Sequence, residues 1–197
     1  MKFIGITGGV GAGKSEILAY LNRRSDTRVM QADDIARQLC EPGTSCNARL
    51  RELFAADAVF VPDGTMDRQR MAEVIFSDEK KRLQMNEIVH PAVREYILTE
   101  YRTAKQQNEL RYLFLEAALL IEEHYDEICD EIWYIYTSEE KRRQRLMSSR
   151  GYSEEKIAAI FASQLAEEEY RRHCVRIIDN NGTAEDTVLQ VIHIIDG

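Results

Sequence analysis

The amino-terminal residues 8–15 have the types and spacing of a phosphate-binding loop. They fit the pattern G-x-x-x-x-G-K-[ST], and the candidate nucleotide-binding residues are Gly8, Gly9, Gly11, Ala12, Gly13, Lys14, Ser15 and the following Glu16. Glycines let the backbone curl so that successive N–H groups point at phosphate oxygens. Lys14 would reach the outer phosphates, and the Ser15 hydroxyl would bind magnesium. The loop therefore predicts binding of a nucleoside triphosphate.

The segments on either side of the loop support this interpretation. Residues 2–7 are typical of a short buried strand, and residues 16–21 of the first turns of a helix. In a strand–loop–helix arrangement, the helix N-terminus adds partial positive charge where the phosphates bind. The constrained positions of the pattern and two matching flanks argue against a glycine-rich turn that fits it by chance.

Three polar residues follow other predicted strands, namely Asp33, Glu116 and Asn180. The carboxyl ends of parallel strands share one edge of a sheet, so we expect these residues on the edge that carries the loop. Asp33 could orient an acceptor hydroxyl and take its proton during phosphoryl transfer. It could equally be the N-cap of a helix that begins at residue 34 or 35. Glu116 could organise magnesium or be a solvated strand end.

Two further groups of residues could bind anions. The basic run at 141–145, followed by Arg150, places Arg142 and Arg145 on one helical face, whereas Arg143 can pair with Glu139. Such an arginine could neutralise charge on a triphosphate, although a solvated, ion-paired helix surface is the commoner use.

The other group is His90-Pro91 with Arg94. Pro91 predicts the first turn of a helix, which would let His90 and Arg94 face an anionic substrate. A histidine that serves only packing is the commoner alternative.

Composition narrows the class of protein. The chain has 197 residues and a net charge of −8, which argues against a general nucleic-acid binder. No apolar run reaches the length of a membrane span, and we expect no signal peptide and no obligatory protein partner. The four cysteines form no C-x-x-C pair, so we expect reduced thiols in the cytoplasm and no zinc site.

The order of predicted elements indicates an α/β protein with a parallel sheet. Predicted strands at 2–7, 27–30, 111–115, 131–136 and 175–178 alternate with helices. Residues 45–105 are mainly helical in pattern and predict a separate lobe, with Leu83, Ile88 and Val93 expected on one buried face. A charged helix is expected over 138–149, and a closing helix carries Val188 and Val191.

Taken together, these segments resemble the dephospho-CoA kinase family over essentially the whole chain. The resemblance is carried by residues 5–15, by Ala32-Asp33 with residues 35–37, by the E-P-G-T turn at 41–44, by His90-Pro91 with Arg94, and by residues 178–182. The phosphate-binding loop is common to many kinases, but this ordered combination is far more specific.

The resemblance implies a fold and a reaction. The fold would be a P-loop NTPase-type three-layer sandwich, a single domain over 1–197. Its core would comprise about 1–44, 108–137 and 172–197, its helical CoA lobe about 45–107, and its lid about 138–171. The reaction would use ATP and Mg²⁺ to phosphorylate the ribose 3′-hydroxyl of dephospho-CoA, giving CoA and ADP in the last step of coenzyme A synthesis.

The resemblance also implies roles for particular residues. Asp33, Lys14 and Arg145 would be catalytic, with Arg145 in the lid. Asp33 would bind substrate together with Arg37, His90 and Arg94, and Asn180 would lie near the adenine of ATP.

The chain departs from the family pattern at three places. Gln31 replaces an aspartate, Glu116-Ala117-Ala118 replaces D-V-P, and Ser149 stands where a lid arginine is expected, with Arg150 next to it. Two other functions remain open from the residues alone. One is a different small-molecule or nucleoside monophosphate kinase, and the other is a regulatory nucleotide-binding switch.

Overall fold

The computed structural model describes residues 1–197, which form two compact units. We call Met1–Met30 with Ala104–Gly197 the sheet unit, and Gln31–Thr103 the helical unit. The phosphate-binding loop belongs to the sheet unit. Residues 31–44 cluster with the helical unit. No helix is both long enough and apolar enough to span a bilayer.

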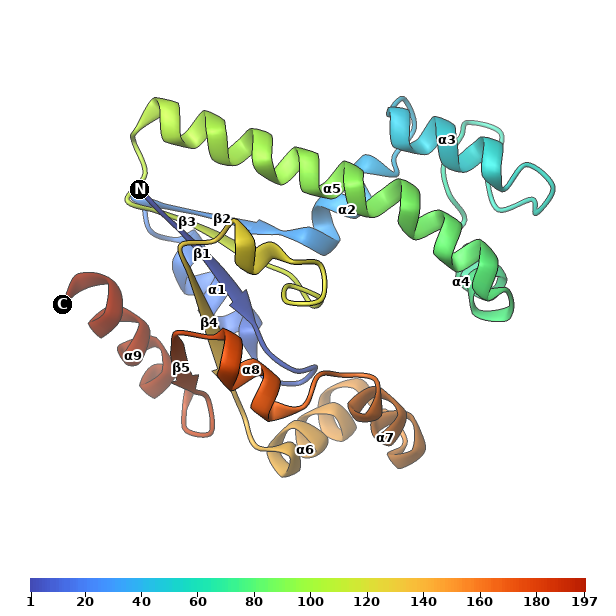
Figure 1. The fold of residues 1–197 in the computed structure, drawn as a ribbon. Helices are drawn as coiled ribbons and strands as arrows, with labels where there is room; N and C mark the ends of the chain where they lie inside the picture. Colours follow the sequence, from blue (N-terminus) through green and yellow to red (C-terminus); the bar gives the residue numbers. More distant parts are fainter. The chain divides into compact units, whose positions relative to one another are not determined.

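A five-stranded sheet forms the centre of the sheet unit (Figure 1). Its strands are β1 (Lys2–Thr7), β2 (Thr27–Gln31), β3 (Tyr112–Glu116), β4 (Glu131–Tyr136) and β5 (Arg176–Asp179), in the order β2-β3-β1-β4-β5. β1 pairs in parallel with β3 and β4, and β4 pairs in parallel with β5. The predicted α/β class and all five strands are confirmed. In this register Glu116 lies opposite Ile6, beside the start of the loop.

One face of the sheet packs on α1 (Lys14–Asn22) and α9 (Ala184–Asp196). The buried cluster between them includes Ile4, Ile6, Ile17, Leu21, Phe114, Trp133, Ile178, Val191 and Ile195. A capping box begins α9, in which Thr183 Oγ1 accepts from Asp186 N, and an Asp186 oxygen accepts from Thr183 N. The buried cluster holds both helices against the strands that carry the loop.

The other face of β4 packs on α8 (Glu167–His173), which follows α6 (Glu139–Arg150) and α7 (Glu154–Ala162). Tyr170 of α8 stacks on Tyr134 with 4.8 Å between ring centroids. Successive strand residues point to opposite faces, so Tyr134 serves this face and Trp133 the first one. The sequence did not predict α8, because Tyr170 is its one buried residue within a charged segment.

The helical unit consists of α2 (Ala32–Leu39), α3 (Ser45–Leu53), α4 (Arg68–Ser77) and most of α5 (Glu79–Gln107). Thr44 caps α3, because its Oγ1 accepts from Asn47 N at 3.0 Å. A turn at Asp63-Gly64 is closed by an antiparallel bridge between Phe60 and Met66. The mainly helical pattern predicted for this region is confirmed.

Two expectations for α5 are wrong. Pro91 lies inside this 29-residue helix rather than in its first turn. Leu83 is 52% exposed, whereas Ile88 and Val93 are buried. Leu83 lies about 140° around the helix from Ile88 and about 120° from Val89, so it faces away from the buried residues at that level of α5. The buried stripe instead follows steps of four, through Val89, Val93 and Ile97.

Candidate phosphate and acceptor sites

The phosphate-binding loop is tightly enclosed by its neighbours in the sheet unit. Gly13 is the N-cap of α1 with φ of 82°, a left-handed conformation that favours glycine. A Cβ on Gly13 would overlap the side-chain amide of Asn180, and one on Gly8 would lie 2.7 Å from the backbone oxygen of Ile135. The glycines of the motif are therefore required by close packing as well as by backbone conformation.

Lys14 places its charge at the first residue of the loop. Its Nζ donates to the Gly8 backbone oxygen at 2.7 Å and lies 3.5 Å from Glu116 Oε1. The Lys14 and Glu116 side chains are only 15% and 13% exposed, so this ion pair is weakly screened by solvent. The amine is thus held where it can bind the outer phosphates of a nucleotide.

The oxygen groups beside Lys14 fit magnesium. Ser15 supplies a hydroxyl next to Lys14, and Glu116 supplies a carboxylate at the end of β3. No group of three or more His, Cys, Asp or Glu side chains in residues 1–197 could form a closed metal site. A hydroxyl and a carboxylate are donors that suit Mg²⁺, which takes one or two protein oxygens and completes its shell with water and substrate phosphates.

Asn180 and Arg145 brace the far end of the loop. The Asn180 amide donates to the Ala12 backbone oxygen at 2.6 Å and accepts from the Thr187 hydroxyl at 2.7 Å. The Arg145 guanidinium donates to the backbone oxygens of Asn180 at 2.9 Å and Ala12 at 3.3 Å. Thr137 also donates to Ala12 O at 3.0 Å.

Thr137 and Thr187 are site residues that the sequence analysis missed. Thr137 directly follows β4, so the rule that singled out Asp33 and Asn180 would have found it. Thr187 gives no such signal, because only the packing of α9 brings its hydroxyl to Asn180.

Arg142 lies over the beginning of the loop. Its guanidinium sits 4.3 Å from the centroid of the Phe161 ring, and a Cβ on Gly9 would overlap its Nη1. The same Cβ would lie 3.1 Å from Gln164 Oε1. Arg142, Phe161 and Gln164 line a cavity of about 300 Å³ that Tyr134 and Tyr170 close. Burial raises the pKa of both tyrosines to about 12, so they remain neutral phenols.

In the helical unit, Asp33 is exposed in the first turn of α2. The N-cap of this helix is Gln31, so the alternative that Asp33 is an N-cap is wrong. Its neighbour Asp34 pairs with Arg37 at 2.9 Å. The Asp33 carboxylate therefore stands at the start of a helix without a capping role.

His90 and Arg94 are one turn apart on α5, so they share a helix face, and both are half-buried. Arg37 lines a cavity of about 180 Å³ in the same unit, and Val89, next to His90, is also part of its wall. The remaining lining residues are Ala36, Cys40, Glu41, Thr65, Met66, Arg68 and Met85. Both arginines form exposed ion pairs, Arg37 with Asp34 and Arg68 with Glu41, and such pairs are weak enough for an anionic ligand to compete with them.

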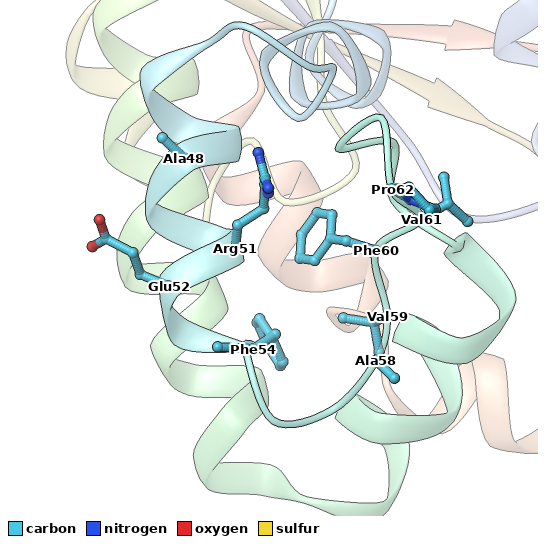
Figure 2. A pocket seen from close by; sticks show the side chains of 10 residues that line it. Ala48, Arg51, Glu52, Phe54, Ala58, Val59, Phe60, Val61 and Pro62 are labelled. Atoms are coloured by element: carbon cyan, nitrogen blue, oxygen red, sulfur yellow. The ribbon is translucent and has the colours of Figure 1, made fainter.

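A larger cavity of about 720 Å³ opens between α3 and the chain that follows it (Figure 2). Figure 2 shows the Phe54 and Phe60 rings turned toward this space and Glu52 turned away from it. None of the predicted substrate-binding residues lines it. Of the two cavities, the smaller one is lined by a predicted substrate-binding residue, Arg37.

A parallel α/β sheet that carries this loop, with a lysine at its mouth, defines a P-loop protein that binds a nucleoside triphosphate. Comparison with known proteins identifies the family. The family model for dephospho-CoA kinase matches residues 2–186. A dephospho-CoA kinase of Shouchella clausii is 36% identical over 188 residues, which cover 95% of this chain and 94% of that protein. One from Geobacter sulfurreducens is 35% identical, with 94% and 93% covered.

Solved structures share the fold of this chain. A Thermus thermophilus protein matches with a TM-score of 0.80 at 30% identity, covering 99% of this chain and 96% of that one. Dephospho-CoA kinase from Campylobacter jejuni matches with a TM-score of 0.74 at 22% identity, covering 99% and 98%. The chain belongs to the dephospho-CoA kinase family, and it phosphorylates dephospho-CoA at the expense of ATP in coenzyme A biosynthesis.

Proposed function

We propose that the protein transfers the γ-phosphoryl group of ATP to the ribose 3′-hydroxyl of dephospho-CoA, giving CoA and ADP. The observation that carries this proposal is the Lys14 amine, held between Gly8 O and Glu116 at the mouth of the glycine loop. Phosphoryl transfer has a loose transition state, so its rate depends on alignment and charge neutralisation more than on a strong base.

On the nucleotide side, the backbone N–H groups of residues 8–13 hold the phosphates, and Lys14 neutralises charge on the outer ones. Ser15 and Glu116 would hold Mg²⁺, which would supply positive charge to the phosphates. Asn180 lies near the adenine in this proposal, and Arg145 acts from the lid. Their hydrogen bonds to Ala12 O support a role in fixing the loop while nucleotide binds.

On the acceptor side, Asp33 orients the 3′-hydroxyl and accepts its proton as the new bond to phosphorus forms. Arg37, His90 and Arg94 bind the anionic part of dephospho-CoA. Support comes from the exposed Asp33 carboxylate at the start of α2, and from the cavity that Arg37 shares with Arg68.

Four free cysteines, three with pKa values that burial raises to about 12, support our proposal of a reducing, cytoplasmic location.

The decisive experiment measures ADP release by the purified protein with ATP, Mg²⁺ and one acceptor at a time. We expect release that depends on dephospho-CoA, and a product that carries its new phosphate on the ribose 3′-oxygen by ³¹P and proton NMR. AMP and shikimate test the rival kinases, and a reaction without acceptor tests the hydrolytic switch. Release that is equal with and without dephospho-CoA would refute the proposal.

A further inference from the structure

The arginines of α6 have different surroundings. Arg143 pairs with Glu139 at 2.8 Å and with Glu154 at 2.5 Å. Arg145 is occupied by the backbone oxygens of Ala12 and Asn180. Arg142 has neither kind of contact, and its guanidinium lies 4.3 Å from the centroid of the Phe161 ring, closer than that of Arg143 at 5.4 Å. Of these three cations, Arg142 is therefore the one whose donors remain available for a ligand.

Arg142 also lies at the beginning of the loop, where we expect the outer phosphates. Its Nη1 lies against Gly9, and the Lys14 amine binds the neighbouring Gly8 O. Arg145 and Asn180 lie at the opposite end, around Ala12, close to where α1 begins. The helix N-terminus holds the inner phosphates of a bound nucleotide, so Lys14 and Arg142 flank the position of its terminal phosphate.

Two buried polar atoms at this place have no hydrogen-bond partner, namely Arg142 Nε and Gln164 Oε1. Leaving a buried donor without a partner costs about 1–3 kcal/mol, and more for a charged group. A charged donor that is unpaired beside a phosphate-binding loop indicates an anionic ligand. The Phe161 ring supports the guanidinium from α7 and limits its freedom before the ligand arrives.

We propose that Arg142 is a catalytic residue that donates hydrogen bonds to the γ-phosphate of ATP. The inference rests on the proposed function. As the bond between the 3′-oxygen and γ-phosphorus forms, the bond to the β,γ-bridging oxygen breaks and ADP leaves with that electron pair. Arg142 neutralises charge on the transferring group, and Asp33 receives the hydroxyl proton.

The test compares Arg142→Gln and Arg142→Lys with Arg143→Gln, a matched loss of charge one residue away. Steady-state kinetics with dephospho-CoA should show that kcat falls by about 100-fold to 1000-fold in Arg142→Gln, the range found when one hydrogen-bond donor to the charge of a transition state is removed. Arg142→Lys should recover part of that loss, because it keeps the charge without the planar fork. Arg143→Gln should retain the wild-type kcat.

Measurements of nucleotide binding distinguish a contact between Arg142 and the γ-phosphate from a purely structural role of Arg142. In Arg142→Gln, calorimetry should show weaker binding of an ATP analogue with a non-hydrolysable β,γ bridge and unchanged binding of ADP, which lacks the γ-phosphate. Equal losses for both nucleotides, or a wild-type kcat in Arg142→Gln, would overturn the proposal. If wild-type protein releases no ADP with dephospho-CoA, the proposed function fails instead, while the comparison of the two nucleotides still tests the contact.

Discussion

At the scale of single residues, Asp33 and Arg142 represent two kinds of charged group. Asp33 is an exposed carboxylate in the first turn of α2, and its neighbour Asp34 is the residue that pairs with Arg37. Arg142 is a half-buried cation whose Nε has no hydrogen-bond partner. Neither side chain caps a helix or forms an ion pair, so we expect the removal of either to affect activity more than stability.

Asp33→Asn tests this expectation. We expect kcat to fall by about 100-fold or more, because the amide can no longer accept the hydroxyl proton, while the affinity for ATP changes little. Asp34→Asn is the control, since its exposed pair with Arg37 is worth about 0–1 kcal/mol and its loss should leave kcat nearly unchanged. Coupled ADP assays over a range of dephospho-CoA concentrations measure both. A wild-type kcat in Asp33→Asn would remove this carboxylate from the mechanism.

At the scale of elements, the loop between β1 and α1 depends on its neighbours for its shape. Ala12 O receives donors from Asn180, Arg145 and Thr137, which belong to the ends of β4 and β5 and to α6. The conformation of the loop therefore depends on hydrogen bonds from several elements and not only on its own eight residues.

Gly8→Ala and Gly43→Ala separate close packing from backbone conformation. Both glycines have positive φ, 153° and 92°, but an added Cβ meets Ile135 O at 2.7 Å in the first case and nothing within 4 Å in the second. We expect Gly8→Ala to lose binding of a fluorescent ADP analogue, because the Cβ would meet the Ile135 backbone oxygen, and the backbone of a central strand cannot move aside as a flexible side chain can. Gly43→Ala should keep that binding and lose only about 1–2 kcal/mol of stability from its left-handed backbone. Equal nucleotide affinity in the two variants would contradict the enclosed loop.

At the scale of the whole molecule, Glu131 links three strands of the sheet. Lys2 donates to it at 2.6 Å from β1, Trp133 at 3.2 Å from β4, and Arg176 at 3.1 Å from β5. Partial burial raises the pKa of Glu131, but the hydrogen bonds from Lys2, Trp133 and Arg176 outweigh it, so the net pKa is below its ordinary value.

The lowered pKa of Glu131 gives a pH dependence of stability with a defined sign. The charged form is favoured in the folded state, so its stabilisation is complete above the unfolded pKa of about 4.3 and is lost as pH falls through the folded pKa. We expect Glu131→Gln to lower the free energy of unfolding by about 1–3 kcal/mol at pH 7, and the difference from wild type to shrink below about pH 4. Urea unfolding followed by circular dichroism measures this. Glu109→Gln, at an exposed position, is the control. A difference between wild type and Glu131→Gln that is independent of pH would refute the ionic contribution.

Much of the molecule could be predicted because its signals are local. The glycine loop, the five apolar strands and the turn at 41–44 each depend on residues that are neighbours in sequence, and the structure has all of them. The failures have equally physical causes. α8 was missed because a single tyrosine supplies its buried face, and Pro91 was misplaced because a helix that begins at Glu79 tolerates it internally.

The sequence by itself therefore determined the class of protein and its family, because a phosphate-binding motif and an ordered set of short segments can be recognised from neighbouring residues alone. Only the tertiary structure distinguished the arginines of α6. Arg142 and Arg145 are the same residue type, and helical spacing puts them on one face of the helix. Which of them braces Ala12 and which lies open over Gly9 depends on how α6 and α7 pack on the loop. Such packing joins residues more than 130 positions apart, and no local pattern encodes it.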